Sequence, residues 1–252
     1  MRTKRKSSSG KVDIPAIEAR LTELLDDGPL PKIVVFDIDY TLWPLWIDTH
    51  CAGPPFRKAE RGGFLDRGGG HIDLAPHARS VIAALHARSV EIGLASRTDE
   101  PEWAEEGLKL IDVQTHSSNG GNGGSGGGSS GSGHIGSSGG GGGSGGSSGG
   151  GGGSGSGGGS SGSGSGGSVM TLHALAAYRE IYPGGKTTHF RRIQAAAGGV
   201  PFGDMLFFDD EHRNVLEVAR LGVVCHHIPD CICVETFAAG LEAFRRSASG
   251  GD

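Results

Sequence analysis

Acidic and hydroxyl side chains directly follow short apolar runs at three points of the chain. Asp37 and Asp39 follow the first run, and Ser96 follows the second. The adjacent pair Asp209 and Asp210 follows the third. If these runs are parallel strands, their carboxyl ends meet at one edge of a sheet, which is where α/β proteins bind ligands. The residue types therefore predict a polar site at that edge.

Lys186 directly precedes a predicted helix. If the start of this helix lies at the same edge, Lys186 adds a positive charge to the set. Four carboxylates at one edge repel one another unless a hard cation lies among them, and ligation by oxygen alone favours Mg²⁺. Asp37 and Asp39 are two residues apart and face the same side in extended backbone, so one can act as nucleophile and the other can transfer protons. The alternative is that both are caps or turn residues after a strand, but the positions of Ser96 and Lys186 favour catalysis.

The segments that must position these residues alternate between strand and helix. Short apolar runs predict strands at Lys32–Phe36, Val90–Ala95, Met205–Phe208 and Val223–His227. Apolar residues at helical spacing predict helices at Asp13–Leu25, Pro76–Arg88, Thr98 or Asp99 to Ile111, Thr187–Ala197, His212–Leu221 and Val234–Phe244. The strands are too apolar for a half-exposed sheet, which indicates a parallel sheet covered on both faces. We therefore expect one doubly wound α/β domain.

A Gly/Ser-rich segment interrupts this pattern. Residues Ser117–Ser168 contain 30 of the 49 glycines, and Ile135 is the only sizeable apolar residue among them. Such a composition predicts a flexible, disordered coil that lacks the side chains to form a core or to anchor a partner. We therefore divide the chain into a basic tail with an N-terminal helix, a first part of the domain, the insertion, and a second part of the domain, at residues 1–30, 31–116, 117–168 and 169–247.

Charge, hydropathy and cysteine content exclude several classes of protein. The net charge is −5 although five Lys and Arg residues lie within the first eleven positions, so the rest of the chain is more acidic still. An acidic body argues against broad nucleic-acid binding, and no apolar run approaches the ~18 residues of a membrane span. Four cysteines do not form a disulfide scaffold, which indicates a reducing compartment. We expect a cytoplasmic monomer, with nuclear or organellar targeting by the basic N-terminus as an alternative.

Four segments resemble the motifs of a known family. Asp37-Ile-Asp-Tyr-Thr-Leu-Trp43 is similar to the DxDxT motif of the haloacid-dehalogenase (HAD) superfamily of aspartyl-phosphate phosphatases. The order of the longer strings resembles the eukaryotic magnesium-dependent phosphatases within that superfamily; these strings are Phe36–Pro44, Ala95–Thr98, Arg179–Gly184 and Phe207–Glu211. The resemblance covers residues 31–114 and 176–244. It implies a HAD-like, Rossmannoid fold and Mg²⁺-dependent hydrolysis of phosphate monoesters.

The resemblance also implies a role for each residue that matches a catalytic motif. Asp37 attacks the phosphorus and becomes an aspartyl phosphate. Asp39 protonates the leaving oxygen and then deprotonates the water that hydrolyses this intermediate. Ser96 and Arg97 hold the phosphoryl oxygens, and Lys186 balances charge on the nucleophile and the phosphate. Phosphoryl transfer depends mainly on positioning and charge neutralisation, which agrees with these roles.

The metal ligands follow from the same resemblance. The family implies that Mg²⁺ is held by the Asp37 carboxylate, the Asp39 backbone carbonyl and Asp210. Asp209 then orients the other ligands or a metal-bound water. The motif alone leaves open whether Asp209 or Asp210 is the direct ligand.

The length of the segment after the nucleophile bears on the substrate. Only some thirty residues, rich in Gly, Pro and charge, separate Thr41 from Pro76, which predicts a minimal cap in the form of a short flap. An open site admits phosphate on a bulky carrier such as a protein side chain. The family resemblance points to phosphotyrosine or phosphorylated sugar adducts on proteins. Free sugar phosphates and a catalytically silent phosphate-binding protein are the alternatives.

Three side chains near the motifs permit two interpretations each. Trp43 and Trp46 either pack a loop or line the substrate entrance. Asn214 either bonds the acidic pair or helps to start a helix.

A zinc site is a weaker hypothesis. Its candidate ligands are Cys225, His226, His227, Cys231 and Cys233. The first three lie on a predicted buried strand, where successive side chains face opposite sides, so they cannot all bind one ion.

Overall fold

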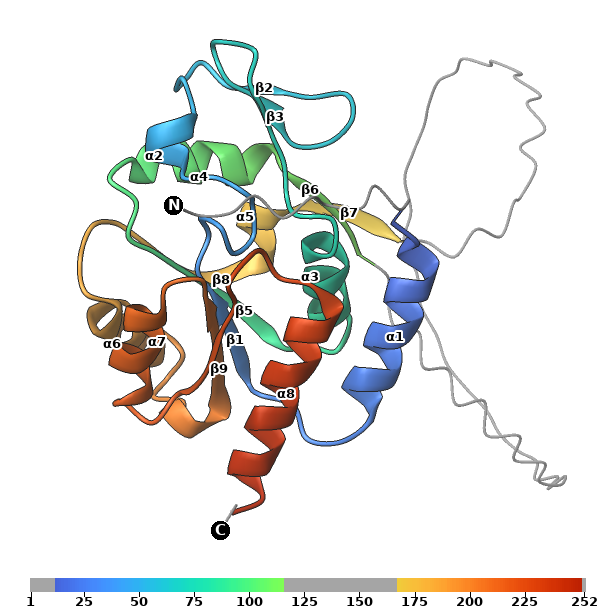
Figure 1. The fold of residues 1–252 in the computed structure, drawn as a ribbon, viewed down its shortest axis with the longest axis vertical. Helices are drawn as coiled ribbons and strands as arrows, with labels where there is room; N and C mark the ends of the chain where they lie inside the picture. The colour runs from blue at the N-terminus through green and yellow to red at the C-terminus, as the bar shows by residue number, and fades with distance from the viewer. Residues whose placement is uncertain (1–11, 116–166, 251–252) are drawn as a thin grey trace, which may run out of the picture. The chain divides into compact units, whose positions relative to one another are not determined.

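A five-stranded parallel sheet forms the centre of the computed structural model, which describes residues 12–115 and 167–250 (Figure 1). The strand order is β10-β9-β1-β5-β8. The bounds are β1 Ile33–Phe36, β5 Glu91–Ser96, β8 Ala176–Ile181, β9 Met205–Asp209 and β10 Val224–His227. All four neighbouring pairs are parallel, so the carboxyl ends of these strands lie at one edge.

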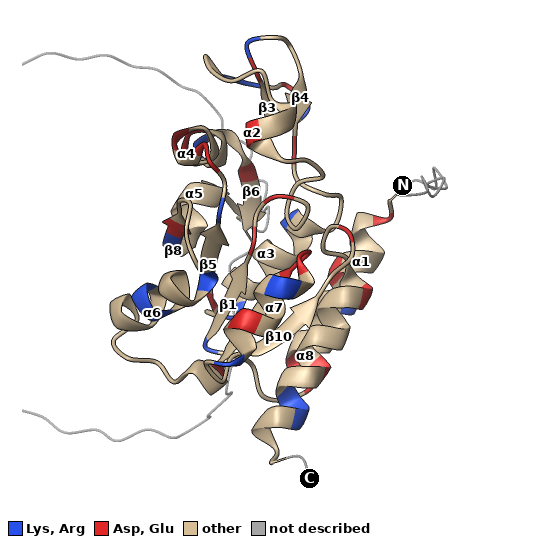
Figure 2. Cartoon of the chain, turned by 60° about the vertical axis from the view of Figure 1, so that its left-hand side comes forward, with Lys and Arg blue, Asp and Glu red and all other residues tan. Residues whose placement is uncertain are grey.

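Helices cover both faces of this sheet, which confirms the doubly wound α/β fold predicted from the sequence. Helices α3 and α8 contact one face, with α1 packed beside them, and α6 and α7 contact the other. Figure 2 shows α6 on one side of β1 and α8 on the opposite side, with acidic and basic residues interspersed along α1 and α8. The helix bounds are α1 Ile14–Asp26, α2 Ile47–His50, α3 Ala78–Ala87, α4 Pro101–Leu110, α5 Leu172–Leu175, α6 Lys186–Ala196, α7 His212–Ala219 and α8 Val234–Ala248.

The central strand β1 is fully buried, and its side chains alternate between two cores. Val34 and Phe36 belong to the larger apolar cluster, in which Phe36 stacks on Phe208. Ile33 and Val35 belong to the smaller cluster on the opposite face. This alternation follows from the two-residue period of a strand and explains why the run is continuously apolar.

A small antiparallel sheet follows the first motif. Its strands are β2 Arg57–Lys58, β3 Phe64–Leu65 and β4 His71–Ile72, in the order β2-β3-β4, and we call the segment Arg57–Ile72 the flap. Asp66 fixes the turn between β3 and β4, because its carboxylate accepts hydrogen bonds from the backbone N–H groups of Ala52 and Gly70, each at 2.7 Å. The flap thus matches the minimal cap expected from the sequence.

Two further strands lie at the ends of the Gly/Ser-rich segment. Strands β6 (Asp112–Thr115) and β7 (Ser168–Thr171) form an antiparallel pair in which Thr115 lies opposite Ser168. The Thr115 hydroxyl donates a hydrogen bond to the Ser168 carbonyl at 2.9 Å. Residues 116–166, and with them nearly all of the predicted insertion, lie outside the described residues, as does the basic tail 1–11. Ser168, which we had assigned to the insertion, is the first residue of β7.

The structure corrects the sequence analysis at two sheet edges. We did not predict β8, because its side chains are polar and partly exposed, as befits an outermost strand. We predicted a buried strand at Val223–His227, but β10 is only half-buried because it forms the opposite edge. Within the described ranges, every helix is too short or too polar to cross a membrane.

Candidate active site

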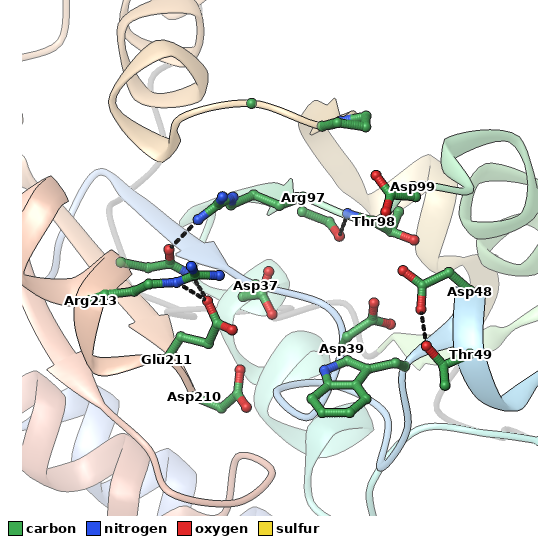
Figure 3. Close-up of a pocket in the computed structure, with 15 residues that line it drawn as sticks. Asp37, Asp39, Asp48, Thr49, Arg97, Thr98, Asp99, Asp210, Glu211 and Arg213 are labelled. Atoms are coloured by element: carbon green, nitrogen blue, oxygen red, sulfur yellow. Dashed lines mark hydrogen bonds and ion pairs between the residues drawn. The ribbon is translucent and has the colours of Figure 1, made fainter.

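A cavity of about 380 Å³ opens at the carboxyl edge of the sheet (Figure 3). Its walls come from the ends of β1, β5 and β9 and from the loops and helices that follow β1, β5, β8 and β9. The residues that line it are Asp37, Asp39, Trp46, Asp48, Thr49, Ser96, Arg97, Thr98, Asp99, Pro183, Gly184, Asp210, Glu211, Arg213 and Asn214. Five of the seven residues predicted for the site line this cavity. The other two, Asp209 and Lys186, are fully buried, and Lys186 pairs with both Asp209 and Asp37.

Lys186 forms a buried ion-pair network with two carboxylates. As the first residue of α6 it is fully buried, and its ammonium lies 2.5 Å from Oδ1 of Asp37 and 3.1 Å from Oδ2 of Asp209. It also donates to the carbonyl of Ala95. Burial lowers the pKa of Lys186, but the two carboxylates outweigh this effect and raise that pKa above its ordinary value. The residue therefore remains a cation and balances negative charge beneath the cavity.

Burial has the opposite consequence for Asp37. It raises the pKa of this carboxyl well above the ordinary value, in spite of the attraction of Lys186, and the negative charge of Asp209 adds to the rise. A second cation near Asp37 would oppose this shift and keep the carboxylate ionised. The arrangement therefore favours a positively charged ligand beside the nucleophile candidate.

Two N–H groups donate hydrogen bonds to the side-chain carboxylate of Asp39. The indole Nε1 of Trp43 donates to Oδ1 of Asp39 at 2.5 Å, and the backbone N–H of Ile47 donates to the same oxygen at 3.3 Å. Burial raises the pKa of Asp39 to about 6, although these two hydrogen bonds oppose the shift. A carboxyl group with a pKa near neutral can release and take up a proton, as general acid–base catalysis requires.

Three carboxylates are close enough to share a metal ion. Oxygen atoms of Asp37, Asp209 and Asp210 lie within 4.8 Å of one another. Burial, together with the charges of Asp209 and Glu211, raises the pKa of Asp210 to about 6. Repulsion within such a group is relieved by a hard divalent cation, and a set of oxygen ligands fits Mg²⁺. The residues present therefore fit a magnesium site.

Asp209 and Asp210 differ in their surroundings. Asp209 is fully buried, and besides the Lys186 ion pair its Oδ1 accepts a hydrogen bond from the backbone N–H of Glu211 at 2.7 Å. The side-chain amide of Asn214 also lies 3.1 and 3.0 Å from its two oxygens. Asp210, in contrast, lines the cavity. Donors in the protein thus surround Asp209, whereas Asp210 faces the space that a ligand would occupy.

Ser96 and Arg97 contribute hydrogen-bond donors from the end of β5. The Ser96 hydroxyl oxygen accepts from the backbone N–H of Thr98 at 3.3 Å, which leaves the hydroxyl proton free to be donated. Arg97 donates to the Asn214 side-chain oxygen at 3.1 Å. Asn214 therefore joins the guanidinium group to the Asp209 carboxylate, a role that the sequence left open.

The two tryptophans after the nucleophile candidate have different environments. Trp43 is fully buried, whereas Trp46 is 44 % exposed at the mouth of the cavity. The Trp46 ring stacks on His50 at a centroid distance of 5.7 Å, and Tyr40 meets it edge-on at 5.2 Å. Of the two interpretations, packing therefore holds for Trp43 and the entrance for Trp46.

The cysteine and histidine residues near β10 do not form a cluster. Cys225 packs with the smaller apolar core, whereas the His226 ring meets Phe208 of the larger one. Among the described residues, the only group of His, Cys, Asp and Glu with metal-ligand spacing is the three aspartates of the cavity. Cys225 and His226 thus contact different cores, as the alternation of side chains along a strand predicts.

Sequence reasoning missed the outer wall of the cavity. Asp48, Thr49, Asp99, Glu211 and Arg213 all line it. They lie on short loops and helix starts, where spacing carries little information about side-chain direction. Their positions next to the recognised motifs were the only available signal.

Comparisons with known proteins identify the family that the chain resembles. The model of the acid phosphatase family matches residues 29–124 and 164–247. The chain is 34 % identical over 221 residues to human magnesium-dependent phosphatase 1, covering 88 % of this chain and 91 % of that protein. It is 31 % identical over 195 residues to a HAD-like hydrolase superfamily protein of Schizosaccharomyces pombe, covering 77 % and 83 %.

One solved structure also aligns with the chain. It is the N-terminal part of the protein BF1531 from Bacteroides fragilis, which contains a phosphatase domain complexed with Mg. The TM-score is 0.43 and the sequence identity is 15 %, over 92 % of this chain and 44 % of that one.

Proposed function

Because the chain belongs to the acid phosphatase family of eukaryotic magnesium-dependent phosphatases within the HAD superfamily, we propose that it hydrolyses phosphate monoesters through an aspartyl phosphate formed on Asp37. The observation that carries this proposal is the position of Asp37. Its carboxylate lines the cavity while one oxygen is bound to a buried ammonium. The carboxylate is thereby fixed in orientation and faces the space where a phosphate would bind.

The reaction requires two displacements at phosphorus. A carboxylate oxygen of Asp37 attacks, the bond from phosphorus to the ester oxygen breaks, and Asp39 gives its proton to the departing oxygen. A water molecule then attacks the aspartyl phosphate and loses a proton to Asp39. The bond from phosphorus to Asp37 breaks, and inorganic phosphate leaves. The pKa of about 6 for Asp39 suits a group that must be protonated in one step and ionised in the next.

Three side chains stabilise the negative charge of the phosphoryl group and of its nucleophile. The Ser96 hydroxyl and the Arg97 guanidinium line the cavity and donate hydrogen bonds to phosphoryl oxygens. Lys186 is fully buried and does not reach the cavity, so it acts through Asp37. It lowers the cost of bringing an anionic phosphate to an anionic carboxylate.

Mg²⁺ would be held by the Asp37 carboxylate, the Asp39 backbone carbonyl and Asp210. We assign Asp210 as the direct ligand because it lines the cavity, whereas Asp209 is already surrounded by Lys186, Asn214 and a backbone donor. When bound, the ion neutralises negative charge between nucleophile and phosphate. Asp209 then holds Lys186 and Asn214 in place.

The substrate class follows from the openness of the site. The flap consists of three two-residue strands, which cannot enclose a substrate as a folded cap domain would. We therefore propose a phosphate ester on a protein, as phosphotyrosine or a phosphorylated sugar adduct. Small free sugar phosphates are the second candidate.

A panel of phosphopeptides, glycated and phosphorylated proteins, and free sugar phosphates tests this proposal. We expect release of inorganic phosphate that depends on Mg²⁺, with kcat/KM at least about tenfold higher for protein-linked esters. Higher kcat/KM on free sugar phosphates would favour the second candidate. Undetectable hydrolysis of every ester, including aryl phosphates, would instead support a silent phosphate-binding protein.

A further inference from the structure

The hydrogen bonds to Asp39 all fall on one of its two oxygens. Among the described residues, its side-chain donors are the indole N–H of Trp43 at 2.5 Å and the backbone N–H of Ile47 at 3.3 Å, and both bind Oδ1. Asp39 lines the cavity, but the residue is only 8 % exposed. With Oδ1 engaged in this way, a proton on the carboxyl group resides on Oδ2.

The turn after the motif brings the indole to this position. Tyr40 adopts a left-handed conformation with φ of 53°, which is unusual for a bulky residue. The backbone N–H groups of Thr41, Leu42 and Trp43 then all approach the Ile38 carbonyl, at 3.2, 2.8 and 3.3 Å. The chain thereby reverses its direction, and the Trp43 indole comes within hydrogen-bond distance of the Asp39 carboxylate.

The flap keeps the indole in place. Phe64 of β3 meets the Trp43 ring edge-on at a centroid distance of 6.3 Å, and Phe56 packs against Phe64 at 5.0 Å. Phe64 in turn lies against Gly107 of α4, where an added Cβ would come within 2.6 Å of the Phe64 ring. Trp43 and Phe64 are both fully buried. The ring therefore has no room to rotate away from Asp39.

We propose that Trp43 is a positioning residue, which binds Oδ1 of Asp39 so that Oδ2 carries the proton to the leaving oxygen. The flap acts as a fixed support for this indole and not as a closing lid. The inference rests on the proposed function, because it presupposes that Asp39 is the general acid. It extends that function by giving a buried aromatic residue a part in leaving-group protonation.

The test is Trp43→Phe, assayed with phosphate esters whose leaving groups differ in basicity. Loss of a hydrogen bond to a charged group predicts a fall in kcat of about tenfold or more for an alkyl phosphate. Dinitrophenyl phosphate has a leaving group that needs little protonation, so its pre-steady-state burst, which reports the first displacement alone, should slow by less than about threefold. The apparent Mg²⁺ affinity should not change.

Two further variants separate lost packing from a lost donor. Site-specific replacement of Trp43 by benzothienylalanine keeps the two-ring shape but substitutes sulfur for the N–H group, and it should reproduce the leaving-group dependence even if Trp43→Phe does not fold. Phe237→Leu disturbs the same apolar cluster at α8 and leaves both Trp43 and its support Phe64 unchanged. It should lower the melting temperature and affect all esters equally.

Asp39→Asn distinguishes failure of this inference from failure of the proposed function. If Asp39→Asn slows the first displacement equally on all esters, Asp39 is not the general acid, and both the inference and the proposed function are wrong. If Asp39→Asn shows leaving-group dependence while both Trp43 replacements lose activity uniformly, only the role of Trp43 is overturned. A further loss when Trp43→Phe is added to Asp39→Asn would also overturn it, because the two residues should act as one unit.

Discussion

Nζ of Lys186 lies 2.5 Å from Oδ1 of Asp37, and the lysine side chain is entirely removed from solvent. The pair joins the start of α6 to the end of β1, 149 positions apart in the sequence. Buried charges are costly unless they are paired, so this contact links the fold of the second half of the domain to the nucleophile candidate of the first.

Lys186→Met should therefore reduce both stability and activity. It leaves Asp37 and Asp209 without their shared cation, and removing one partner of a buried pair costs about 3–5 kcal/mol. We expect at least a hundredfold loss of kcat/KM, at about 3 kcal/mol or more of transition-state stabilisation. Mg²⁺ should raise the melting temperature of this variant more than that of the unmodified protein, since the ion becomes the main neutralising charge.

Lys32→Met is the matched control. Its ion pair with Asp204 at 2.9 Å is exposed to solvent, so its loss should cost about 0.5 kcal/mol or less. Equal destabilisation of the two variants in urea titrations would contradict the importance assigned to the buried pair.

Metal dependence should separate Asp210 from other acids of the cavity. EDTA should abolish turnover and Mg²⁺ should restore it, whereas Ca²⁺ should not, because it is larger and accepts more ligands. Asp210→Asn should raise the Mg²⁺ concentration for half-maximal activity by about tenfold or more. Asp99→Asn, which changes an exposed acid of the same cavity, should leave that concentration within about twofold. A larger effect of Asp99→Asn than of Asp210→Asn on that Mg²⁺ concentration would show that Asp210 is not a metal ligand.

His189 predicts a pH dependence of stability. This residue of α6 is fully buried, and neither ring nitrogen has a hydrogen-bond partner among the described residues. Burial, with the charge of Lys186, lowers its pKa to about 4. The unfolded chain binds a proton near the ordinary value of 6.5, so stability falls as the pH drops from 6.5 towards 4.

Urea denaturation at two pH values measures this contribution. Between about pH 7.5 and pH 5, His189 should account for a loss of about 2 kcal/mol. His189→Phe should lack that part of the pH dependence, while His86→Gln, at an exposed position of α3, should keep it. If His189→Phe loses as much stability on acidification as the unmodified protein, then His189 is not buried in neutral form.

We expect residues 116–167 to be dispensable for catalysis, because β6 and β7 pair on either side of them. Thr115 lies opposite Ser168, so the ends of this segment are already neighbours. If the segment is a flexible coil, as its composition predicts, a six-residue linker should stabilise the protein by about 2 kcal/mol at most. We expect kcat/KM on an aryl phosphate to change by less than about twofold. A tenfold fall at an unchanged melting temperature would show that the segment takes part in the site.

The sequence predicted the central strands, which are buried on both sides, but it missed the edge strand β8 and indicated wrongly that the edge strand β10 is buried. β1 is apolar throughout, and β5 and β9 are apolar over Ile92–Ala95 and Met205–Phe208, because both faces of the central sheet are covered. β8 carries Arg179 and Glu180, so its pattern resembles a loop although it pairs with β5 along its length. The apolar pattern of a segment reflects how deeply it is buried. An outermost strand is less buried than a central one, so its pattern is weaker.

The motif predicted which residues meet in the cavity but not how they are supported. The spacing of Asp37 and Asp39 indicates a shared side of the chain. The bond from Trp43 to Asp39, in contrast, depends on a turn in which Tyr40 has a positive φ. No periodic pattern encodes such a turn, since only its backbone geometry brings the indole back.

The most direct test of the central claim is mass-spectrometric mapping of the phosphoryl group after rapid acid quench of turnover. The account predicts one phosphoryl group on the peptide that contains Asp37. With isotopically labelled substrate, the label on this peptide should disappear when excess unlabelled substrate is added. The phosphoryl group should accumulate in Asp39→Asn with an aryl phosphate. Asp37→Asn should carry no phosphoryl group and should have lost turnover while remaining folded. A phosphoryl group on any other residue, or more than a few per cent of activity in Asp37→Asn, would contradict the aspartyl-phosphate mechanism.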